Sequence, residues 1–264
     1  MLPYFYLFDR LISVYALLSL IGVLTAGSFA YQYAKRNALD PLDMTVLLLV
    51  AAFAGWAGSH LTYALVNFQE LRIFVLNLGK ISSFSQFIDY IQYLFGGAVY
   101  YGGLITGMLA GLLLARKKKL DTDRYADVAA AAIPLFHGFG RIGCFLGGCC
   151  FGVECKIGFI YRNAIIEEAN GIRRFPVQLL EAFLNFSLFF ILWWFLRKSK
   201  YSGILLYLYL CSYAVIRFTL EFWRGDDYRG FLLGLSTSQF IAVITFVFGL
   251  VMILIKRHRR LSAT

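Results

Sequence analysis

The sequence predicts an all-α, polytopic membrane protein with about seven transmembrane helices. Hydrophobic residues make up 60% of the 264 residues and charged residues 15%, whereas about 25% of the residues in soluble chains are charged. Long runs without Asp, Glu, Lys or Arg recur along the chain, and a membrane span needs about 20 consecutive apolar residues. No repeat, low-complexity tract or long linker divides the chain. We therefore expect a single polytopic transmembrane domain over residues 1–264.

Four charge-free runs predict four of the spans. They cover residues 11–34, 44–69, 90–115 and 230–255. The first run resembles a secretory signal peptide in part, but it is longer than the apolar region of such a peptide, so we expect it to be retained as a helix. Between the second and third runs, the apolar residues of segment 84–94 keep helical spacing, which predicts a short helix at the membrane surface.

Three further apolar stretches carry charge inside them and complete the seven. They are residues 127–150 with Arg141, a stretch running to residue 197 with Glu181, and a stretch starting near residue 202 with Arg217 and Glu221. An ionised side chain at bilayer depth costs several kcal/mol unless it is paired or faces water. These charged residues are therefore candidates for function.

The distribution of basic residues predicts the orientation. If the N-terminus lies outside, fourteen Lys and Arg residues fall in the inner segments and nine in the longer outer segments. Cytoplasmic loops hold the excess of basic residues, so we expect the N-terminus outside and the C-terminus in the cytoplasm. The net charge of +10 is divided among short loops, which favours anionic lipid headgroups, and not nucleic acid, as its partners.

Polar side chains recur at helical spacing on the three charged stretches. Residues three or four apart share one helix face. Three helices with polar faces predict one wet cavity, and arginines inside it suit a phosphorylated lipid headgroup. A purely structural Arg217–Glu221 pair is the alternative for the last stretch. The faces consist of His137 and Arg141; of Gln178, Glu181 and Asn185; and of Tyr213, Arg217, Glu221 and Arg224.

Residues 140–152, GRIGCFLGGCCFG, resemble the signature of prolipoprotein diacylglyceryl transferases, whose usual form is G-R-x-G-N-F-x-N-G-E-x-x-G. The resemblance covers nearly the whole chain and implies seven spans around a lipid-binding cavity. Four other segments are similar to motifs of that family in the same order: ISVYALLSLIG (12–22), GGAVYYGGLITG (96–107), RFPVQLLEA (174–182) and YAVIRFTLEFWRGDD (213–227).

The resemblance implies an enzyme of the bacterial inner membrane that transfers the diacylglyceryl group of phosphatidylglycerol to the lipobox cysteine thiol of a preprolipoprotein. Its partners would be phosphatidylglycerol, preprolipoprotein signal peptides and the lipid bilayer, and no cofactor is expected. Glycerol phosphate leaves as the thiolate attacks, and cations that neutralise it lower the barrier. The match gives this role to Arg141 and Arg217, with Glu221 orienting Arg217. Substrate contacts are expected from Tyr15, Gly102, Gly103, Gly143, Gly152, Gln178, Glu181 and Tyr213.

The chain departs from the family pattern at three places. One is residues 58–61, GSHL, where the family usually has G-A-R-L. Tyr101 stands where the family carries a His thought essential, and Cys144, Gly147 and Cys149 stand where the signature carries Asn, Asn and Glu. His137 could supply the imidazole as a base for the thiol, or it could make one hydrogen bond between packed helices. Tyr101 could itself bond the phosphate. We include both residues among the catalytic candidates.

Four cysteines occupy twelve residues: Cys144, Cys149, Cys150 and Cys155. They could pack as small apolar side chains, form a disulfide or redox pair on the oxidising side of the membrane, or ligate zinc with a nearby His. The usual C-x2-C spacing is absent, so no metal is predicted and the four cysteines are only weak ligand candidates.

Two other classes of function stay open. A diverged relative could keep the lipid cavity and act on another thiol acceptor, or in thiol redox or metal handling. A lipid-binding or transport protein without chemistry would use the same charged cavity. Lipidation of a lipobox peptide in the presence of phosphatidylglycerol distinguishes the transferase from both.

Overall fold

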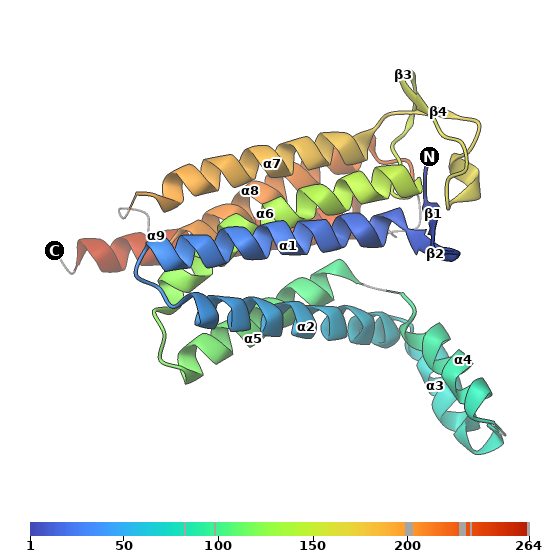
Figure 1. Ribbon diagram of the computed structural model, residues 1–264, viewed down its shortest axis with the longest axis horizontal. Coiled ribbons are helices and arrows are strands. Elements are labelled where there is room, and N and C mark those ends of the chain that lie inside the picture. The colour runs from blue at the N-terminus through green and yellow to red at the C-terminus, as the bar shows by residue number, and fades with distance from the viewer. Residues whose placement is uncertain (82, 98, 199–202, 227–230, 233, 263–264) are drawn as a thin grey trace. The chain divides into compact units, whose positions relative to one another are not determined.

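A computed structural model describes residues 1–81, 83–97, 99–198, 203–226, 231–232 and 234–262 (Figure 1). The chain forms two compact units. The first unit consists of Met1–Ala38 and Asp123–Thr264, and the second of Leu39–Thr122.

Long helices with nearly parallel axes build the first unit (Figure 1). Among them α6 and α8 bury the largest share of their residues, so they form the centre of the unit. The short 3-10 helix η4 (Glu221–Trp223) extends α8 by one turn. The helices are α1 (Val14–Arg36), α6 (Thr122–Gly147), α7 (Val177–Leu196), α8 (Leu205–Leu220) and α9 (Thr237–Leu261).

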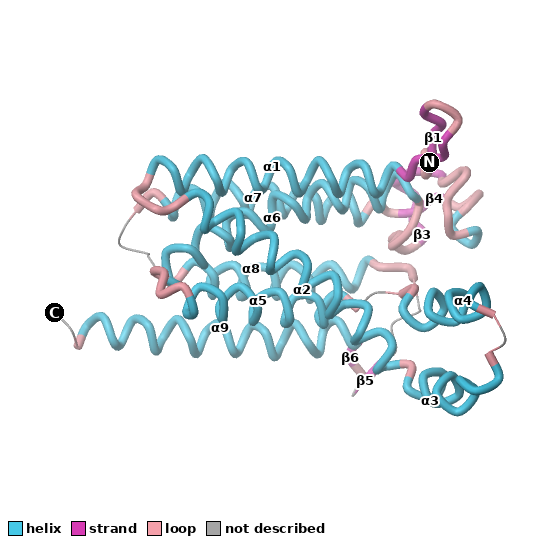
Figure 2. The backbone as a smooth tube through the Cα atoms, turned by 60° about the horizontal axis from the view of Figure 1, so that its bottom comes forward, coloured by secondary structure: helices cyan, strands magenta, loops and turns pink. Residues whose placement is uncertain are grey.

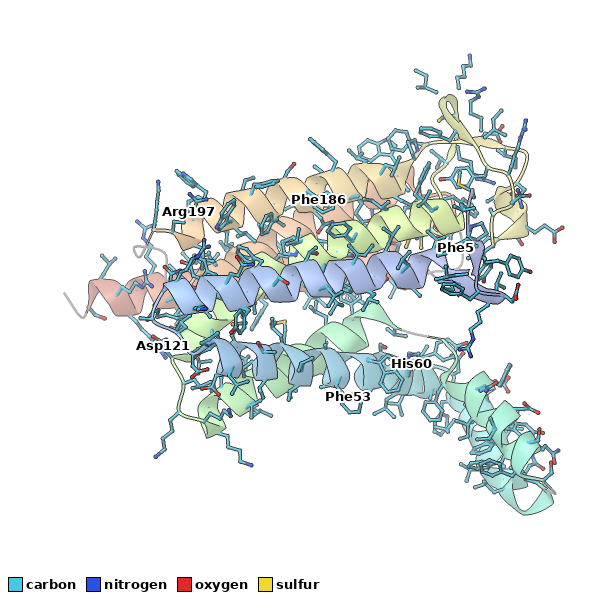
Figure 3. All side chains as sticks on the ribbon, viewed as in Figure 1. Phe5, Phe53, His60, Asp121, Phe186 and Arg197 are labelled. Carbon is cyan, nitrogen blue, oxygen red and sulfur yellow. The ribbon has the colours of Figure 1, made fainter. Side chains whose placement is uncertain are left out.

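Glycines let the neighbouring helices approach α6. A Cβ on Gly138 would lie 2.6 Å from Cε1 of Phe186, which α7 directs at α6 (Figure 3). A Cβ on Gly22 of α1 would lie 3.0 Å from the carbonyl oxygen of Phe136. Small residues at such contacts allow close packing of membrane helices, so α1, α6 and α7 are held at short distance.

Among the described residues, three short strand pairs lie at the end of the first unit where α1 begins and α6 ends (Figure 2), one before α1 and two between successive helices. All three pairs are antiparallel. A 3-10 helix, η2 (Glu167–Ala169), lies between the strands of the second pair. The pairs are β1 (Tyr4–Leu7) with β2 (Arg10–Ser13), β3 (Glu154–Ile160) with β4 (Arg173–Arg174), and β5 (Phe231–Leu232) with β6 (Leu235–Ser236).

The second unit is built on the close packing of α2 and α5. A Cβ on Gly103 would lie 2.8 Å from the carbonyl oxygen of Gly55, and one on Gly107 would lie 2.8 Å from that of Ala51. Nδ1 of His60 lies 2.6 Å from the carbonyl oxygen of Phe95 (Figure 3). The elements are α2 (Pro41–Val66), α3 (Phe68–Asn77), η1 (Leu78–Lys80), α4 (Phe84–Phe95) and α5 (Tyr100–Lys117).

The all-α membrane fold predicted from the sequence is confirmed. Within the described residues, six helices are long and apolar enough to span a membrane: α1, α2, α6, α7, α9 and α8 with its extension η4. The short helix predicted over residues 84–94 is present as α4, and its position at the membrane surface stays a prediction. The predicted run 90–115 is divided, since α4 ends at Phe95 and α5 begins at Tyr100 after two glycines. A count of seven spans and the orientation of the termini stay predictions.

Candidate functional site

Glu181 is the point where α6, α7 and α8 meet. This residue is 1% exposed, and its Oε1 lies 3.0 Å from Nε of Arg141 on α6. The same oxygen accepts a hydrogen bond of 3.3 Å from the hydroxyl of Tyr213 on α8. A buried carboxylate is tolerated only where charges and hydrogen bonds compensate it. Glu181 therefore holds Arg141 and Tyr213 together from the third helix.

The predicted polar faces of α6 and α7 do point into the first unit. His137, one turn before Arg141, is buried, and its ring centroid lies 5.0 Å from that of Tyr213. Gln178 and Asn185, on either side of Glu181 along α7, are also buried. The spacing of these residues in the sequence thus identified the faces on which the helices meet.

Arg217 of α8 has two acceptors. Its Nη2 forms an ion pair of 2.5 Å with Oε2 of Glu221 and donates a hydrogen bond of 3.0 Å to the hydroxyl of Ser238. The predicted Arg217–Glu221 pair is therefore present. Glu221 already belongs to η4, so the regular helical face that was expected to continue to Arg224 ends at Leu220.

Both arginines keep unused hydrogen-bonding capacity. Nη1 of Arg217 and Nε of Arg141 are buried and have no hydrogen-bond acceptor among the described residues. The carboxylate of Glu181 lies within ion-pair distance of Arg141, but it does not accept a hydrogen bond from the Nε–H group. Buried donors without acceptors are rare in folded proteins. The two guanidinium groups thus have the charge and the free N–H groups that an anionic ligand requires.

The loop after α6 is fixed to the start of α7 and the end of α8. Nε2 of Gln178 donates to the carbonyl oxygen of Cys149 at 2.8 Å, while the hydroxyl of Tyr161 donates to Oε1 of Gln178 at 3.1 Å. Gly152 pairs with Arg224 in an antiparallel bridge. Gln178 therefore acts on the loop backbone, and its contact with substrate stays a prediction.

Arg224 is anchored beside this loop. Its Nε and Nη2 donate to the two carboxylate oxygens of Asp226 at 3.0 and 2.6 Å. Burial lowers the pKa of the Arg224 guanidinium, but the hydrogen bonds and charge of Asp226 outweigh burial, so the pKa is raised above its ordinary value. Arg224 is therefore a permanent positive charge at the end of α8.

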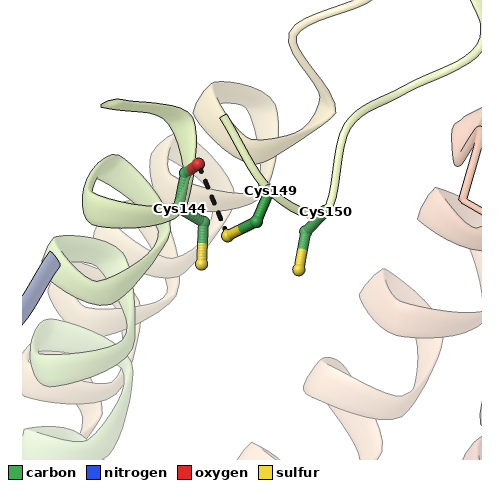
Figure 4. Close-up of side chains that lie close together, drawn as sticks. All are labelled: Cys144, Cys149 and Cys150. Carbon is green, nitrogen blue, oxygen red and sulfur yellow. Dashed lines mark hydrogen bonds between the residues drawn. The ribbon is translucent and has the colours of Figure 1, made fainter. Parts of the chain in front are cut away.

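Three of the four clustered cysteines converge. The sulfur atoms of Cys144, Cys149 and Cys150 all lie within 4.8 Å of one another (Figure 4). Cys155 is outside this group, and its thiol lies 2.5 Å from the carbonyl oxygen of Ile157. All five cysteines of the chain are free thiols in the structure.

The pKa values of Cys149 and Cys150, which follow the end of α6, are shifted in opposite directions. Hydrogen bonds from Cys144 and Cys149 lower the pKa of Cys150, and the charges of Arg224 and Arg141 act in the same direction against burial. Hydrogen bonding with Cys144 and Cys150, together with burial, raises the pKa of Cys149. The pKa of Cys150 is therefore shifted down and that of Cys149 up.

Two of the predicted glycines in the first unit allow close backbone contacts. A Cβ on Gly143 would lie 3.2 Å from Cα of Tyr15, and one on Gly152 would lie 2.3 Å from the carbonyl oxygen of Phe175. Tyr15, which is 46% exposed, therefore lies beside α6 at the level of Gly143. Protein packing explains both glycines, and their contact with substrate stays a prediction.

Three other predicted site residues, Tyr101, Gly102 and Gly103, lie on α5 in the second unit. A Cβ on Gly102 would lie 2.1 Å from Oγ1 of Thr62 on α2, and Gly103 faces Gly55 of the same helix. These two glycines are accounted for by the packing of α2 on α5. A role of the three residues toward substrate stays a prediction.

The sequence analysis missed several residues that support the site. Tyr161 and Ser238 bind Gln178 and Arg217, and nothing in the local sequence marks them. Asp127 had a signal, because it is a charged residue at the start of the apolar stretch 127–150. It is buried and accepts hydrogen bonds from the backbone N–H groups of Gly203 and Leu205, so it fixes the start of α8.

Comparison with known proteins gives consistent matches. A family model described as prolipoprotein diacylglyceryl transferase matches residues 4–255. A relative from Clostridium tetani, named phosphatidylglycerol–prolipoprotein diacylglyceryl transferase, is 32% identical over 258 residues, which cover 97% of this chain and 98% of the relative. A relative of the same name from Geobacter sulfurreducens is 29% identical over 253 residues and covers 94% and 92%.

A partial match has higher identity. A protein from Clostridium perfringens, named phosphatidylglycerol–prolipoprotein diacylglyceryl transferase 2, is 37% identical over 158 residues, which cover 59% of this chain and 61% of the relative. The matches to the family model and to the first two relatives run through both compact units.

Proposed function

Because the chain belongs to the prolipoprotein diacylglyceryl transferase family, we propose that it transfers the diacylglyceryl group of phosphatidylglycerol to the lipobox cysteine thiol of prolipoproteins. The chain is a multi-pass protein of the bacterial inner membrane. The acceptor would be the signal-peptide region of a preprolipoprotein, which reaches the enzyme while still in the bilayer. Both compact units would belong to one polytopic domain with the N-terminus outside.

The observation that carries the assignment of the site is the pair of arginines that each have a buried, unused N–H donor. Nη1 of Arg217 and Nε of Arg141 have no acceptor among the described residues. A phosphate diester supplies oxygens that can accept from both. As the C–O bond to the glycerol carbon breaks, negative charge grows on the phosphate. Cationic donors that are already in place stabilise that charge in the transition state more than in the ground state.

The residues around the arginines would position them. Glu181 compensates the charge of Arg141, and Glu221 does so for Arg217. Tyr213 hydrogen-bonds Glu181 and would orient the carboxylate. Each carboxylate removes part of the burial cost of its arginine, so the arginines remain charged and fixed when the lipid is absent.

The remaining candidates would contact the substrates. Tyr15 is exposed beside α6 and would meet the lipid headgroup. His137 is buried against Tyr213, where a neutral imidazole could accept the proton of the acceptor thiol. Tyr101 on α5 would donate a hydrogen bond to the phosphate, and Gly102 and Gly103 would act indirectly, through the close packing of α2 on α5.

Complementation tests this function. The chain would be expressed in a bacterium depleted of its own diacylglyceryl transferase, and growth and the mass of a reporter lipoprotein would be followed. We expect rescue with a mass increase of one diacylglyceryl group, and loss of rescue in Arg141→Ala and Arg217→Ala. Arg197→Ala is the matched control, because this arginine lies over the ring of Trp193 at the other end of α7. Failure of a well-inserted wild-type chain to modify the reporter would contradict the proposal.

The product identifies the acceptor. If the chain carries the cavity of the family but uses another thiol, the lipobox reporter stays unmodified while a different protein gains the diacylglyceryl mass. If the chain only binds or transports lipid, no protein gains it. Mass spectrometry of the membrane proteome in the depleted strain separates these two outcomes.

A further inference from the structure

The thiols of Cys144, Cys149 and Cys150 form a cluster to which the proposed reaction gives no role. They come from the last turn of α6 and from the loop that follows it. Their sulfur atoms lie within 4.8 Å of one another (Figure 4), and all three are free. A disulfide uses two sulfurs, whereas here three converge. Convergence of three thiols is the arrangement of a metal ligand set.

The loop backbone is shaped so that the thiols meet. Gly148 has φ +74 and Cys150 has φ 55, and a residue other than glycine in the left-handed region is uncommon and costs about 1 kcal/mol or more. The loop is held in this shape by the hydrogen bond from Nε2 of Gln178 to the carbonyl oxygen of Cys149. The left-handed conformation of Cys150 is therefore maintained, and it brings the Cys150 thiol close to the other two thiols.

Zinc suits this ligand set. A zinc ion binds thiolate sulfur at about 2.3 Å, which places two sulfurs on one tetrahedral ion about 3.8 Å apart, and separations within 4.8 Å need only small side-chain adjustments. Three thiolates with Zn²⁺ carry a net charge of −1, and Arg141 and Arg224 already interact electrostatically with Cys150. Three protein ligands also leave the fourth position of the ion open, as in catalytic zinc sites.

We propose that Cys144, Cys149 and Cys150 bind one Zn²⁺ ion whose open position takes the acceptor thiol of the prolipoprotein as a thiolate. This inference rests on the proposed transfer activity. Binding to the ion releases the thiol proton to solvent, because a coordinated thiol is deprotonated. The sulfur then attacks the glycerol carbon, a C–S bond forms, and the C–O bond breaks with its electron pair leaving on glycerol phosphate. No electrons are exchanged with an outside group.

The position of the cluster fits this step. Cys144 follows Arg141 by three residues on α6, so the two side chains share one face of the helix. The ion that holds the nucleophilic sulfur would therefore lie one helical turn from the guanidinium that receives the leaving phosphate. Thiolate, and not thiol, is the nucleophile in such reactions. Coordination would supply it by stabilising the deprotonated form of the acceptor sulfur.

Metal content and a cobalt spectrum test the site without reference to activity. The full-length chain is purified in detergent with a reductant, stripped with a chelator, and titrated with Zn²⁺ or Co²⁺. We expect one ion per chain and a thiolate-to-cobalt charge-transfer band. A lipobox peptide should change that band, whereas the same peptide with Ser in place of its Cys should not. These measurements use the wild-type chain, so they do not depend on variants that fold poorly.

Substitutions locate the ligands. Cys144→Ser, Cys149→Ser and Cys150→Ser should each weaken zinc binding by more than about tenfold, since loss of even an outer-shell partner costs that much. Cys155→Ser and Cys211→Ser are matched controls that should bind zinc like the wild type, because neither thiol belongs to the cluster. Reduced zinc binding in the controls alone would overturn the assignment of the ligands.

The outcomes separate this inference from the proposed function. If the metal-free chain transfers diacylglyceryl groups as fast as the zinc-loaded chain, the inference is overturned and the transferase stands. If the chain binds zinc through the three cysteines and the peptide thiol changes the cobalt band, but no transfer occurs, the site stands and the transferase fails. A disulfide among the three cysteines, or preference for copper without response to the peptide, would also overturn the inference.

Discussion

At the scale of single residues, the site depends on charges that are buried in pairs. Arg141 is compensated by Glu181, and Arg217 by Glu221. Removing one partner of a buried ion pair leaves the other charge without compensation, which is far more costly than the net value of the pair. The two carboxylates are therefore required for stability as well as for positioning.

Glu181→Gln tests this at the centre of the site. The amide keeps an acceptor for Tyr213 but removes the charge that compensates Arg141. We expect a loss of about 3 kcal/mol in the free energy of unfolding, measured by thermal or denaturant unfolding in detergent. Glu154→Gln is the control, because this residue is exposed on β3 and its substitution should change stability by less than about 0.5 kcal/mol. Equal stability of both variants would contradict a structural role for Glu181.

Arg217→Lys tests whether the guanidinium fork is needed. Lysine keeps the charge but cannot donate to Glu221, Ser238 and a phosphate oxygen in the fixed geometry of arginine. We expect the transfer rate to fall on the order of 100-fold, while Arg197→Lys, on the predicted cytoplasmic side, should leave it unchanged. The rates would be measured with purified protein and a lipobox peptide. Full activity of Arg217→Lys would mean that charge alone is sufficient.

At the scale of elements, glycine determines how closely helices pack. A Cβ on Gly107 of α5 would lie 2.8 Å from the carbonyl oxygen of Ala51, whereas one on Gly111 of the same helix would lie 3.7 Å from the nearest atom, Cβ of Ala51. The first distance is shorter than real Cβ contacts and the second is an ordinary one. The same helix thus contains a position that excludes a methyl group and one that accepts it.

Gly107→Ala and Gly111→Ala form a matched pair. Overpacking costs typically 1–3 kcal/mol, so we expect Gly107→Ala to lower the stability of the α2–α5 pair by about that amount. Gly111→Ala should be neutral or slightly stabilising, because alanine is the better helix former. Thermal unfolding of the two variants in the same detergent measures the difference. The reverse order would show that α2 and α5 pack differently.

The elements also show how far the sequence could predict the structure. Apolar runs and spacing identified the six long apolar helices and the polar faces of α6, α7 and α8. They could not identify the pair Arg141–Glu181, because spacing along one helix says nothing about which residue faces it from another. They did not predict β3 and β4 either, because residues 151–176 have no clean alternation of apolar and polar side chains.

At the scale of the whole molecule, the distribution of basic residues gives a testable topology. The inner segments were predicted to hold fourteen of the basic residues, including the last turn of α9 with Arg259 and Arg260. A fluorescent protein fused to the C-terminus should fold and fluoresce in the cytoplasm, and a fused periplasmic phosphatase should be inactive. The opposite pair of results would reverse the orientation and place the cysteine cluster on the cytoplasmic side.

Convergence of the three cysteines was the feature least accessible to the sequence. Their spacing, five residues and one residue, lacks the pattern that usually signals a metal site. The three thiols meet only because the backbone turns left-handed at Gly148 and Cys150. Such a turn is unusual for cysteine and cannot be read from composition or periodicity.

The central claim is that Arg141 and Arg217, each with a buried N–H donor that has no acceptor among the described residues, hold a phosphate while a thiol displaces it. Purified protein would be given phosphatidylglycerol labelled in its glycerol phosphate and a lipobox peptide. We expect one labelled glycerol phosphate released for each peptide that gains a diacylglyceryl group, and neither product from Arg141→Ala that retains its fold. Release without peptide modification, or full activity of the folded Arg141→Ala variant, would contradict the account.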